Sequence, residues 1–323
     1  MSQQPQRGTS GVARRGGGAG RSRTPTVPPS TRRRGAAAGP RWVAYAYLAP
    51  ALVFFVSFVL VPLFRVVGFS FYDWNGIGAA TWVGFGNYAR MLANTQLHQS
   101  LIHSLVFIVT FSALPVAIGL VLAAILGRRP IRGMAFFRTI LFLPQVTMMV
   151  AVGVAWRWMY AENGTLNQIL RFVGIESADT AWLGSFDWAL PMVGLVGTWV
   201  MFGFCMLLFL AGVGKIDVTL YDAARVDGAG PVREFFTVTL PGLRQEITVA
   251  VIVTMIAALR SFDLVYVTTG GGPGISTLVP GFLIYRLAFR AGDVGAAASV
   301  AVLLSLLIFT VVLVVSRLLR EKE

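Results

Sequence analysis

Three long stretches of the sequence contain no charged residue, namely residues 105–126, 188–214 and 294–316. Each is longer than the ~20 residues with which an α-helix crosses the hydrocarbon core of a bilayer. Charged residues make up 13% of the 323-residue chain, whereas soluble domains contain about 25%. The sequence therefore predicts an all-α, polytopic membrane protein and excludes a water-soluble globule.

Six segments are long and apolar enough for transmembrane helices of ~17–25 residues. They are residues 42–64, 103–126, 138–160, 188–213, 246–268 and 295–317. The connections 128–138 and 214–244 are rich in Lys and Arg, whereas 161–187 contains four acidic residues and one arginine. Because Lys and Arg accumulate in cytoplasmic loops, we expect six transmembrane helices within residues 42–320, with both termini in the cytoplasm.

Several of these segments contain a proline. The positions are Pro50, Pro62, Pro115, Pro144 and Pro191. Each proline removes a backbone hydrogen bond and tends to kink its helix, and kinked helices can line a cavity. Proline is also tolerated in ordinary membrane helices, so no single proline identifies a pathway.

The first 41 residues contain nine arginines and no acidic residue, and they account for most of the net charge of +13. They contain few large apolar side chains, so they cannot bury enough surface to fold. We expect a disordered, basic cytoplasmic tail over residues 1–41. Such a tail can bind nucleic acid or anionic lipid, but a solvated tail that helps to orient the chain explains the composition equally simply, and we expect no nucleic-acid partner.

Residues that carry catalytic or metal chemistry are scarce. Cys205 is the single cysteine, and His98 and His103 are the two histidines, so an intramolecular disulfide is excluded and no metal site is expected. Gly214-Lys215 does not form a phosphate-binding loop, because Ile216 follows where Ser or Thr is needed. We therefore expect neither an enzyme nor a cofactor in this chain, and any energy for transport must come from another subunit.

The cytoplasmic connection 214–244 contains signals for two short helices. Asp217 can cap a helix over residues 218–226, Gly228 suits the left-handed turn that ends it, and Pro231 can begin a second helix. Small alanine side chains keep one surface of this helix pair shallow. The pattern predicts a compact element that can fit into a groove of a partner protein.

This element resembles the EAA loop of binding-protein-dependent ABC importer permeases, whose pattern is E-A-A-x3-G-x9-I-x-L-P. The matching positions are Asp222, Ala223, Ala224, Gly228, Val238, Leu240 and Pro241. Asp222 replaces the glutamate of the pattern, and Asp217 stands where a proline often precedes it. The resemblance implies that Asp222, Ala223, Ala224, Asp227, Gly228, Leu240 and Pro241 couple the chain to an ATPase. The alternative is that Asp222 only pairs with Arg225 on the surface of one helix, a contact of about 0.2 to 0.5 kcal/mol.

Further motifs extend the resemblance over residues 42–317 and point to carbohydrate importers. They are residues 48–51 (LAPA), 84–88 (GFGNY), 142–144 (FLP), 182–184 (WLG), 262–266 (FDLVY) and 269–273 (TGGGP). The last two are similar to the maltose and glycerol-3-phosphate importers. The resemblance implies the type I ABC importer permease fold in a bacterial plasma membrane.

The same resemblance implies a set of partners. They are a second permease subunit, two cytoplasmic ATPase subunits that bind ATP, and an external solute-binding protein. The implied function is import of a sugar, a disaccharide or an oligosaccharide. The alternatives are import of glycerol phosphate or another polar solute, a membrane-embedded enzyme, and a channel that needs no ATP.

The candidates for the solute path are polar and aromatic residues within the spans. Arg260 and Asp263 lie three positions apart in the fifth span, so on one helix they share a face; they either orient a polar solute or form a structural ion pair. Gln145 can hydrogen-bond a solute. The aromatic candidates are Trp156, Trp199 and Tyr266, which offer either stacking faces for sugar rings or the aromatic belt of a membrane interface.

Overall fold

The structure is a computed structural model that describes residues 41–127, 133–175 and 180–319. The tail predicted for residues 1–41 lies outside these ranges except for Arg41, the first residue of α1. The chain divides into two compact units, residues 1–54 and 55–323. Helix α1 (Arg41–Phe55), a π-helical turn (Val56–Leu60) and α2 (Val61–Phe69) form one apolar run of 25 residues from Tyr45 to Phe69. This run corresponds to the first predicted span.

A small layer of irregular structure follows α2. It contains the two-residue strands β1 (Tyr72–Asp73) and β2 (Thr81–Trp82), which pair antiparallel, and the helix α3 (Gly86–Leu92). The buried side chain of Asn87 donates to the carbonyl oxygens of Ser70 and Tyr72 over 3.0 and 2.8 Å. Arg90 forms an ion pair of 3.0 Å with Asp293, which precedes the last helix. These bonds fasten the layer to the end of α2 and to the start of the last helix.

Two long helices form the centre of the second unit. One is a 32-residue run of α4 (Thr95–Ile108), a π-helical turn (Val109–Ala113) and α5 (Leu114–Leu126), and the other is α9 (Ala189–Val213). Their backbones approach closely because Gly119 faces α9, where an added Cβ would lie 2.7 Å from the Cβ of Cys205. Small residues permit such contacts between membrane helices. Together with the last helix, α16 (Val294–Leu319), they match three predicted spans.

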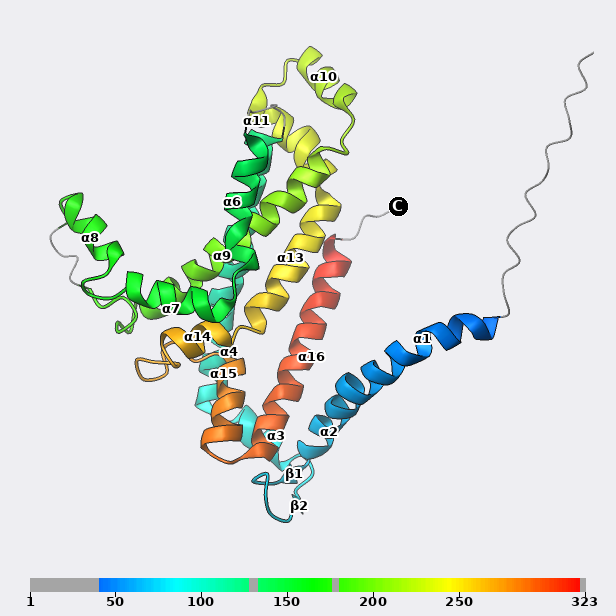
Figure 1. Ribbon diagram of the computed structural model, residues 1–323, viewed down its shortest axis with the longest axis vertical. Coiled ribbons are helices and arrows are strands. Elements are labelled where there is room, and N and C mark those ends of the chain that lie inside the picture. The colour runs from blue at the N-terminus through cyan, green and yellow to red at the C-terminus, as the bar shows by residue number, and fades with distance from the viewer. Residues whose placement is uncertain (1–40, 128–132, 176–179, 320–323) are drawn as a thin grey trace, which may run out of the picture. The chain divides into compact units, whose positions relative to one another are not determined.

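The third and fifth spans differ from the prediction of continuous helices over 138–160 and 246–268. The third consists of α6 (Met134–Val146) and α7 (Met149–Met159), bent by 97° (Figure 1). Pro144 removes a hydrogen bond in the last turn of α6, and Thr147 and Met148 then take extended backbone angles. The fifth is also interrupted. Helix α13 (Arg244–Leu259) ends within it, and α14 (Asp263–Thr268) begins after a gap of three residues.

The described residues therefore contain four continuous helices that could cross a membrane, or up to six if each of two bent pairs counts as one span. The second bent pair joins the segment Pro231–Gly242 to α13 at 72°. The all-α membrane architecture is confirmed, and the number six holds only with this counting.

Short helices occupy the two ends of the second unit (Figure 1). One end carries α10 (Val218–Val226), α11 (Pro231–Glu234), a π-helical turn (Phe235–Thr239) and α12 (Leu240–Gly242). The other end carries α3, the strand pair and the junction of α15 (Pro280–Tyr285), through a π-helical turn (Arg286–Arg290), with α16. Helix α8 (Thr165–Phe172) follows α7.

Candidate functional site

The coupling element, defined as residues 217–242, has the helix boundaries that the sequence predicts. The carboxylate of Asp217 accepts a 2.9 Å hydrogen bond from the backbone N–H of Thr219, which starts α10 and holds the pKa of this carboxyl below its usual range. Gly228 has φ +76°, and the N–H groups of Gly228 and Ala229 donate to the carbonyls of Arg225 and Ala224. This is a Schellman end, in which glycine avoids the strain of a left-handed residue.

Polar contacts hold α10 against the helix that follows it. Arg225 donates from Nε to the carboxylate of Glu234 at 3.0 Å, and the side chain of Glu234 is buried. The hydroxyl groups of Tyr221 and Thr239 lie 3.2 Å apart. Both contacts join α10 to residues beyond Pro231 and so brace the two halves of the element against each other.

The surface contact between Asp222 and Arg225 is also present, at 3.3 Å. It is the weaker of the two contacts of Arg225, because the side chain of Asp222 is 63% exposed and exposed pairs contribute little. Ala223, Asp227 and Gly228 are exposed on the same helix. The carboxylate of Asp222 thus remains accessible to a partner protein.

The base of the coupling element is anchored to the central helices. Lys215 and Glu246 form a 2.9 Å ion pair between the end of α9 and the start of α13. Leu240 is half-buried and Pro241 is exposed in the short helix α12, which leads into the 72° bend before α13. The chain that leaves the coupling element therefore continues directly into α13.

Three of the predicted solute-path residues line one space in the interior. This inner cavity has a volume of about 400 Å³. It is lined by Phe111, Gln145, Met149, Met201, Val253, Ile256, Ala257, Arg260, Ser261, Phe262, Asp263 and Leu264. Both helix interruptions contribute to it, since Gln145 and Met149 flank the first and residues 260–262 form the second. Irregular backbone inside a membrane occurs where it is buried in protein or lines a cavity.

Three polar side chains of the inner cavity lack hydrogen-bond or ion-pair partners within the part of the chain that the structure describes. Gln145 has a buried Oε1 with no hydrogen-bond partner. Arg260 and Asp263 are both exposed, and no ion pair joins them. The interpretation of these two residues as a structural ion pair therefore has no contact that supports it in this structure. Arg260 lies at the end of α13 and Asp263 begins α14, so the spacing of a single helix does not apply to them.

The three aromatic candidates lie outside the inner cavity. Trp156 and Trp199 contact each other edge to face, with ring centroids 5.5 Å apart. Tyr266 stacks on Phe262 at 5.4 Å, and only Phe262 of this pair lines the cavity. The apolar walls from Phe111, Met149 and Met201 were missed by sequence reasoning, because such residues in a span look identical to ordinary core.

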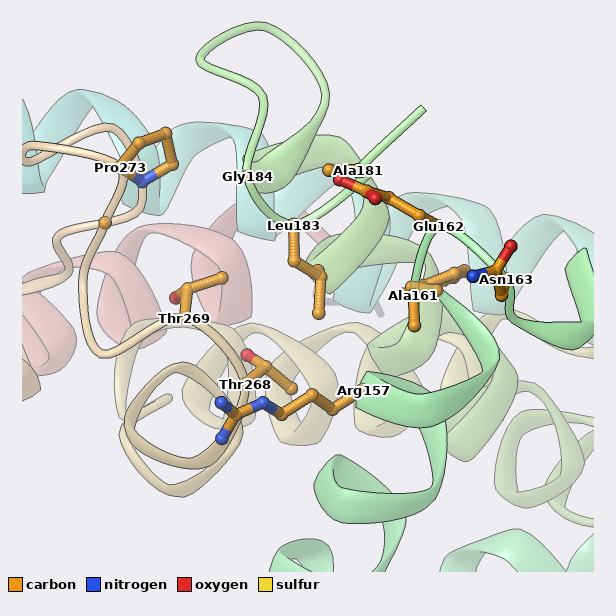
Figure 2. A pocket seen from close by; sticks show the side chains of 12 residues that line it. Arg157, Ala161, Glu162, Asn163, Ala181, Leu183, Gly184, Thr268, Thr269 and Pro273 are labelled. Carbon is orange, nitrogen blue, oxygen red and sulfur yellow. The ribbon is translucent and has the colours of Figure 1, made fainter. Parts of the chain in front are cut away.

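A second hollow lies between the far ends of α7 and α14 (Figure 2). This outer pocket has a volume of about 680 Å³ and is lined by Arg157, residues 160–163, Ala181, Leu183, Gly184, Thr268, Thr269, Gly272 and Pro273. Five of these residues belong to the motifs 182–184 and 269–273, but no motif joins those two segments to residues 157–163. Within the described parts of the chain, no three His, Cys, Asp or Glu side chains gather as a metal site.

Known proteins resemble this chain over most of its length. It is 36% identical over 272 residues to the diacetylchitobiose uptake system permease protein NgcF of Streptomyces coelicolor, covering 80% of this chain and 77% of the relative. It is 32% identical over 289 residues to the sulfoquinovosyl glycerol transport system permease protein SmoG of Agrobacterium fabrum (88% and 92%), and 32% identical over 248 residues to the lactose transport system permease protein LacF of Rhizobium radiobacter (76% and 83%). No protein-family model matches the chain.

The fold also matches a solved structure. A crystal structure of a bacterial ABC transporter involved in the import of the acidic polysaccharide alginate contains a chain with TM-score 0.72 and 21% identity, covering 86% of this chain and 95% of that one. A second structure of such a transporter, in complex with an alginate pentasaccharide-bound periplasmic protein, gives TM-score 0.73. The resemblance found in the motifs is confirmed.

Proposed function

The chain belongs to the permease subunits of ABC transporters, and we propose that it forms part of the membrane pathway of a sugar importer. The observation that carries this proposal is that relatives named for the transport of diacetylchitobiose, lactose, sulfoquinovosyl glycerol and arabinooligosaccharides match 76% to 88% of the chain. The solute is a disaccharide or a short oligosaccharide.

The inner cavity supports a neutral, hydroxyl-rich solute. Its lining contains one cation, Arg260, and one carboxylate, Asp263, together with the free Oε1 of Gln145. Sugar hydroxyl groups can accept from the guanidinium and donate to both oxygens, whereas a phosphate would be repelled by Asp263 and is usually bound by several cationic groups. The volume of about 400 Å³ falls in the range of small-molecule sites. These features favour a sugar over glycerol phosphate.

The coupling element is the docking site for a cytoplasmic ATPase. Five apolar side chains on it are exposed: Val218, Leu220, Val226, Val232 and Phe236. They lie on the same element as the accessible carboxylate of Asp222, and the contact of Arg225 with Glu234 braces this element internally. Such a combination of apolar surface and one charge suits a protein partner. ATP is bound by that partner, and a second permease subunit and an external solute-binding protein complete the importer.

The chain is oriented in the bacterial plasma membrane with both termini in the cytoplasm. The content of Lys and Arg in 214–244 supports this orientation. Reporter fusions after Gly230 should read cytoplasmic and fusions after Pro273 should read external. An external reading at Gly230 would contradict both the orientation and the docking role of the coupling element.

Uptake measurements test the function directly. Cells that lack the gene are compared with cells in which it is restored, using radiolabelled lactose, diacetylchitobiose and glycerol 3-phosphate. Restoration of uptake of a sugar, but not of glycerol 3-phosphate, is the expected result. Cells with Asp222→Lys serve as the control, because this variant should insert normally and fail to couple to the ATPase. Uptake of glycerol 3-phosphate alone would refute the sugar assignment.

A further inference from the structure

The walls of the outer pocket are fixed by one buried amide. Asn167 is fully buried, and its Nδ2 donates to the carbonyl oxygens of Ala161, Glu162 and Thr180 over 3.3, 2.9 and 3.0 Å. Its Oδ1 accepts a 2.6 Å hydrogen bond from the indole of Trp182. A single side chain thus joins the turn after α7 to the loop before α9, which are two of the walls of the pocket.

The opposite wall is equally ordered. Thr277 donates from its hydroxyl to the carbonyl of Gly272 over 2.9 Å, and its Oγ1 lies 2.7 Å from that of Thr269. Gly271 has φ +86°, and an added Cβ there would lie 2.8 Å from the ring of Phe282. The loop 269–273 is therefore held in one shape against α15. A pocket with fixed walls binds without the loss of loop entropy on association.

The charged groups of the outer pocket have no partner of their own. Arg157, Glu162 and Asn163 are exposed, and their side chains make no hydrogen bond or ion pair with the parts of the chain that the structure describes. Figure 2 shows Arg157 and Thr268 at one side of the pocket and Glu162 and Asn163 at another. Among the described lining residues, Arg157 and Glu162 carry one charge of each sign, and hydroxyl groups can bond to both signs.

One helix pair connects the outer pocket to the inner cavity. Helices α7 and α14 pack closely at Gly153, where an added Cβ would lie 3.2 Å from Val267. The pair lines the inner cavity through Met149 and Leu264, and it lines the outer pocket through Arg157 and Thr268. Met149 and Arg157 are eight residues apart, which corresponds to about 12 Å along a helix.

We infer that the outer pocket is a second saccharide-binding site, in which neutral sugar is held by Arg157 and Glu162 before it reaches the inner cavity. The inference rests on the proposed function for the class of solute and on the proposed orientation for the order of the two sites. The balanced charges and the volume of about 680 Å³ suit a neutral disaccharide.

The single cysteine of the chain makes a labelling experiment possible. Cys205 is fully buried and is replaced in a Cys205→Ala background, into which Asn163→Cys is introduced. The full chain is expressed with its partner subunits in cells, and an impermeant maleimide is applied from outside, with and without lactose or diacetylchitobiose. At ten times the dissociation constant the site is about 90% occupied, so labelling should slow about tenfold.

Two further variants make the result specific. Phe172→Cys places a cysteine on α8, at a residue that is 92% exposed and outside the pocket, and its labelling should not change with sugar. Arg157→Gln in the Asn163→Cys chain should raise the sugar concentration needed for protection about tenfold, because it removes a charged hydrogen-bond donor.

The possible outcomes separate the inference from the proposed function. Protection of the cysteine at position 163 that weakens in Arg157→Gln supports the inference. Absence of protection in cells that take up the same sugar would overturn it and leave the proposed function intact. Protection that requires the solute-binding protein and is independent of sugar would also overturn it, because the pocket would then be a docking site for that protein. Protection without uptake would refute the proposed function alone.

Discussion

Replacement of Asp263 by asparagine tests the assignment of the inner cavity most directly. The substitution keeps the size of the side chain and removes its charge. Because Asp263 and Arg260 do not form an ion pair, Asp263→Asn should leave the amount of protein in the membrane unchanged. The same substitution should weaken solute binding, since a carboxylate accepts a stronger hydrogen bond from a sugar hydroxyl than an amide does.

The size of this effect follows from the exposure of the site. A hydrogen bond to a charged group contributes about 1.5 to 3 kcal/mol and one between neutral groups about 0.5 to 1.5 kcal/mol. Asp263 is exposed to the cavity, so the lower end of the difference applies, about 1 kcal/mol. This corresponds to a roughly fivefold increase in the solute concentration that gives half-maximal uptake.

The assay is the initial rate of sugar uptake by cells, with membrane abundance measured on immunoblots of the same cells. Asp187→Asn is the matched control, because Asp187 is an exposed carboxylate outside the cavity. The double variant Arg260→Gln with Asp263→Asn reports whether the two residues bind the solute independently. Unchanged half-maximal uptake in Asp263→Asn would refute its role in solute binding. Loss of the protein from the membrane would show that the residue is structural.

Three other predictions concern the coupling element and the helix packing. The variant Gly228→Pro should abolish solute-stimulated ATP hydrolysis by the assembled transporter, because proline cannot adopt φ +76°. Gly230→Ala is its control and should keep this activity, because Gly230 has φ −74° and an added Cβ would meet no atom within 4 Å. Equal activity of both variants would refute the docking role. Gly203→Ala would press a Cβ against the backbone of α6 and should destabilise the chain by about 1 to 3 kcal/mol, which is measured as a lower unfolding temperature. Gly68→Ala is its control, because an added Cβ there would meet no atom within 4 Å. The pKa of Asp217 is lowered in the folded chain, so the stabilisation of α10 by this cap is fully present above pH about 4 and disappears as the pH falls through the lowered pKa. Hydrogen exchange of the α10 amides, corrected for the intrinsic exchange rate, should therefore stay constant between about pH 5 and 8.

The architecture could be predicted from the sequence wherever one local signal decided it. Charge-free runs located α9 and α16, and the residues Asp217, Gly228 and Pro231 located the ends of α10 and the start of α11. The interruptions at residues 147–148 and 260–262 were not predictable from hydropathy. An apolar run looks the same whether its helix continues or turns by 97°. Pro144 marks a place where the helix can break, but it does not give the size of the turn.

The candidate sites show the same difference between local and tertiary information. Polar residues in apolar spans drew attention to Gln145, Arg260 and Asp263, and the structure places all three on one cavity. Their relationship was misjudged, because the helical spacing of Arg260 and Asp263 does not extend across a break. The outer pocket was not predicted as a site, although the motifs 182–184 and 269–273 supply part of its lining, since Arg157 and Thr268 belong to segments that are distant in sequence.

The two helix interruptions also affect how readily such a chain can acquire a new solute. Residues within a membrane helix must fit their neighbours on all sides, so a change of volume there disturbs packing. Residues at the interruptions, such as Gln145 and Asp263, border empty space on one side, and their replacement alters the lining without displacing a helix. Selection for a different glycoside can therefore act on a few cavity positions while the coupling element and the α5–α9 contact stay as they are.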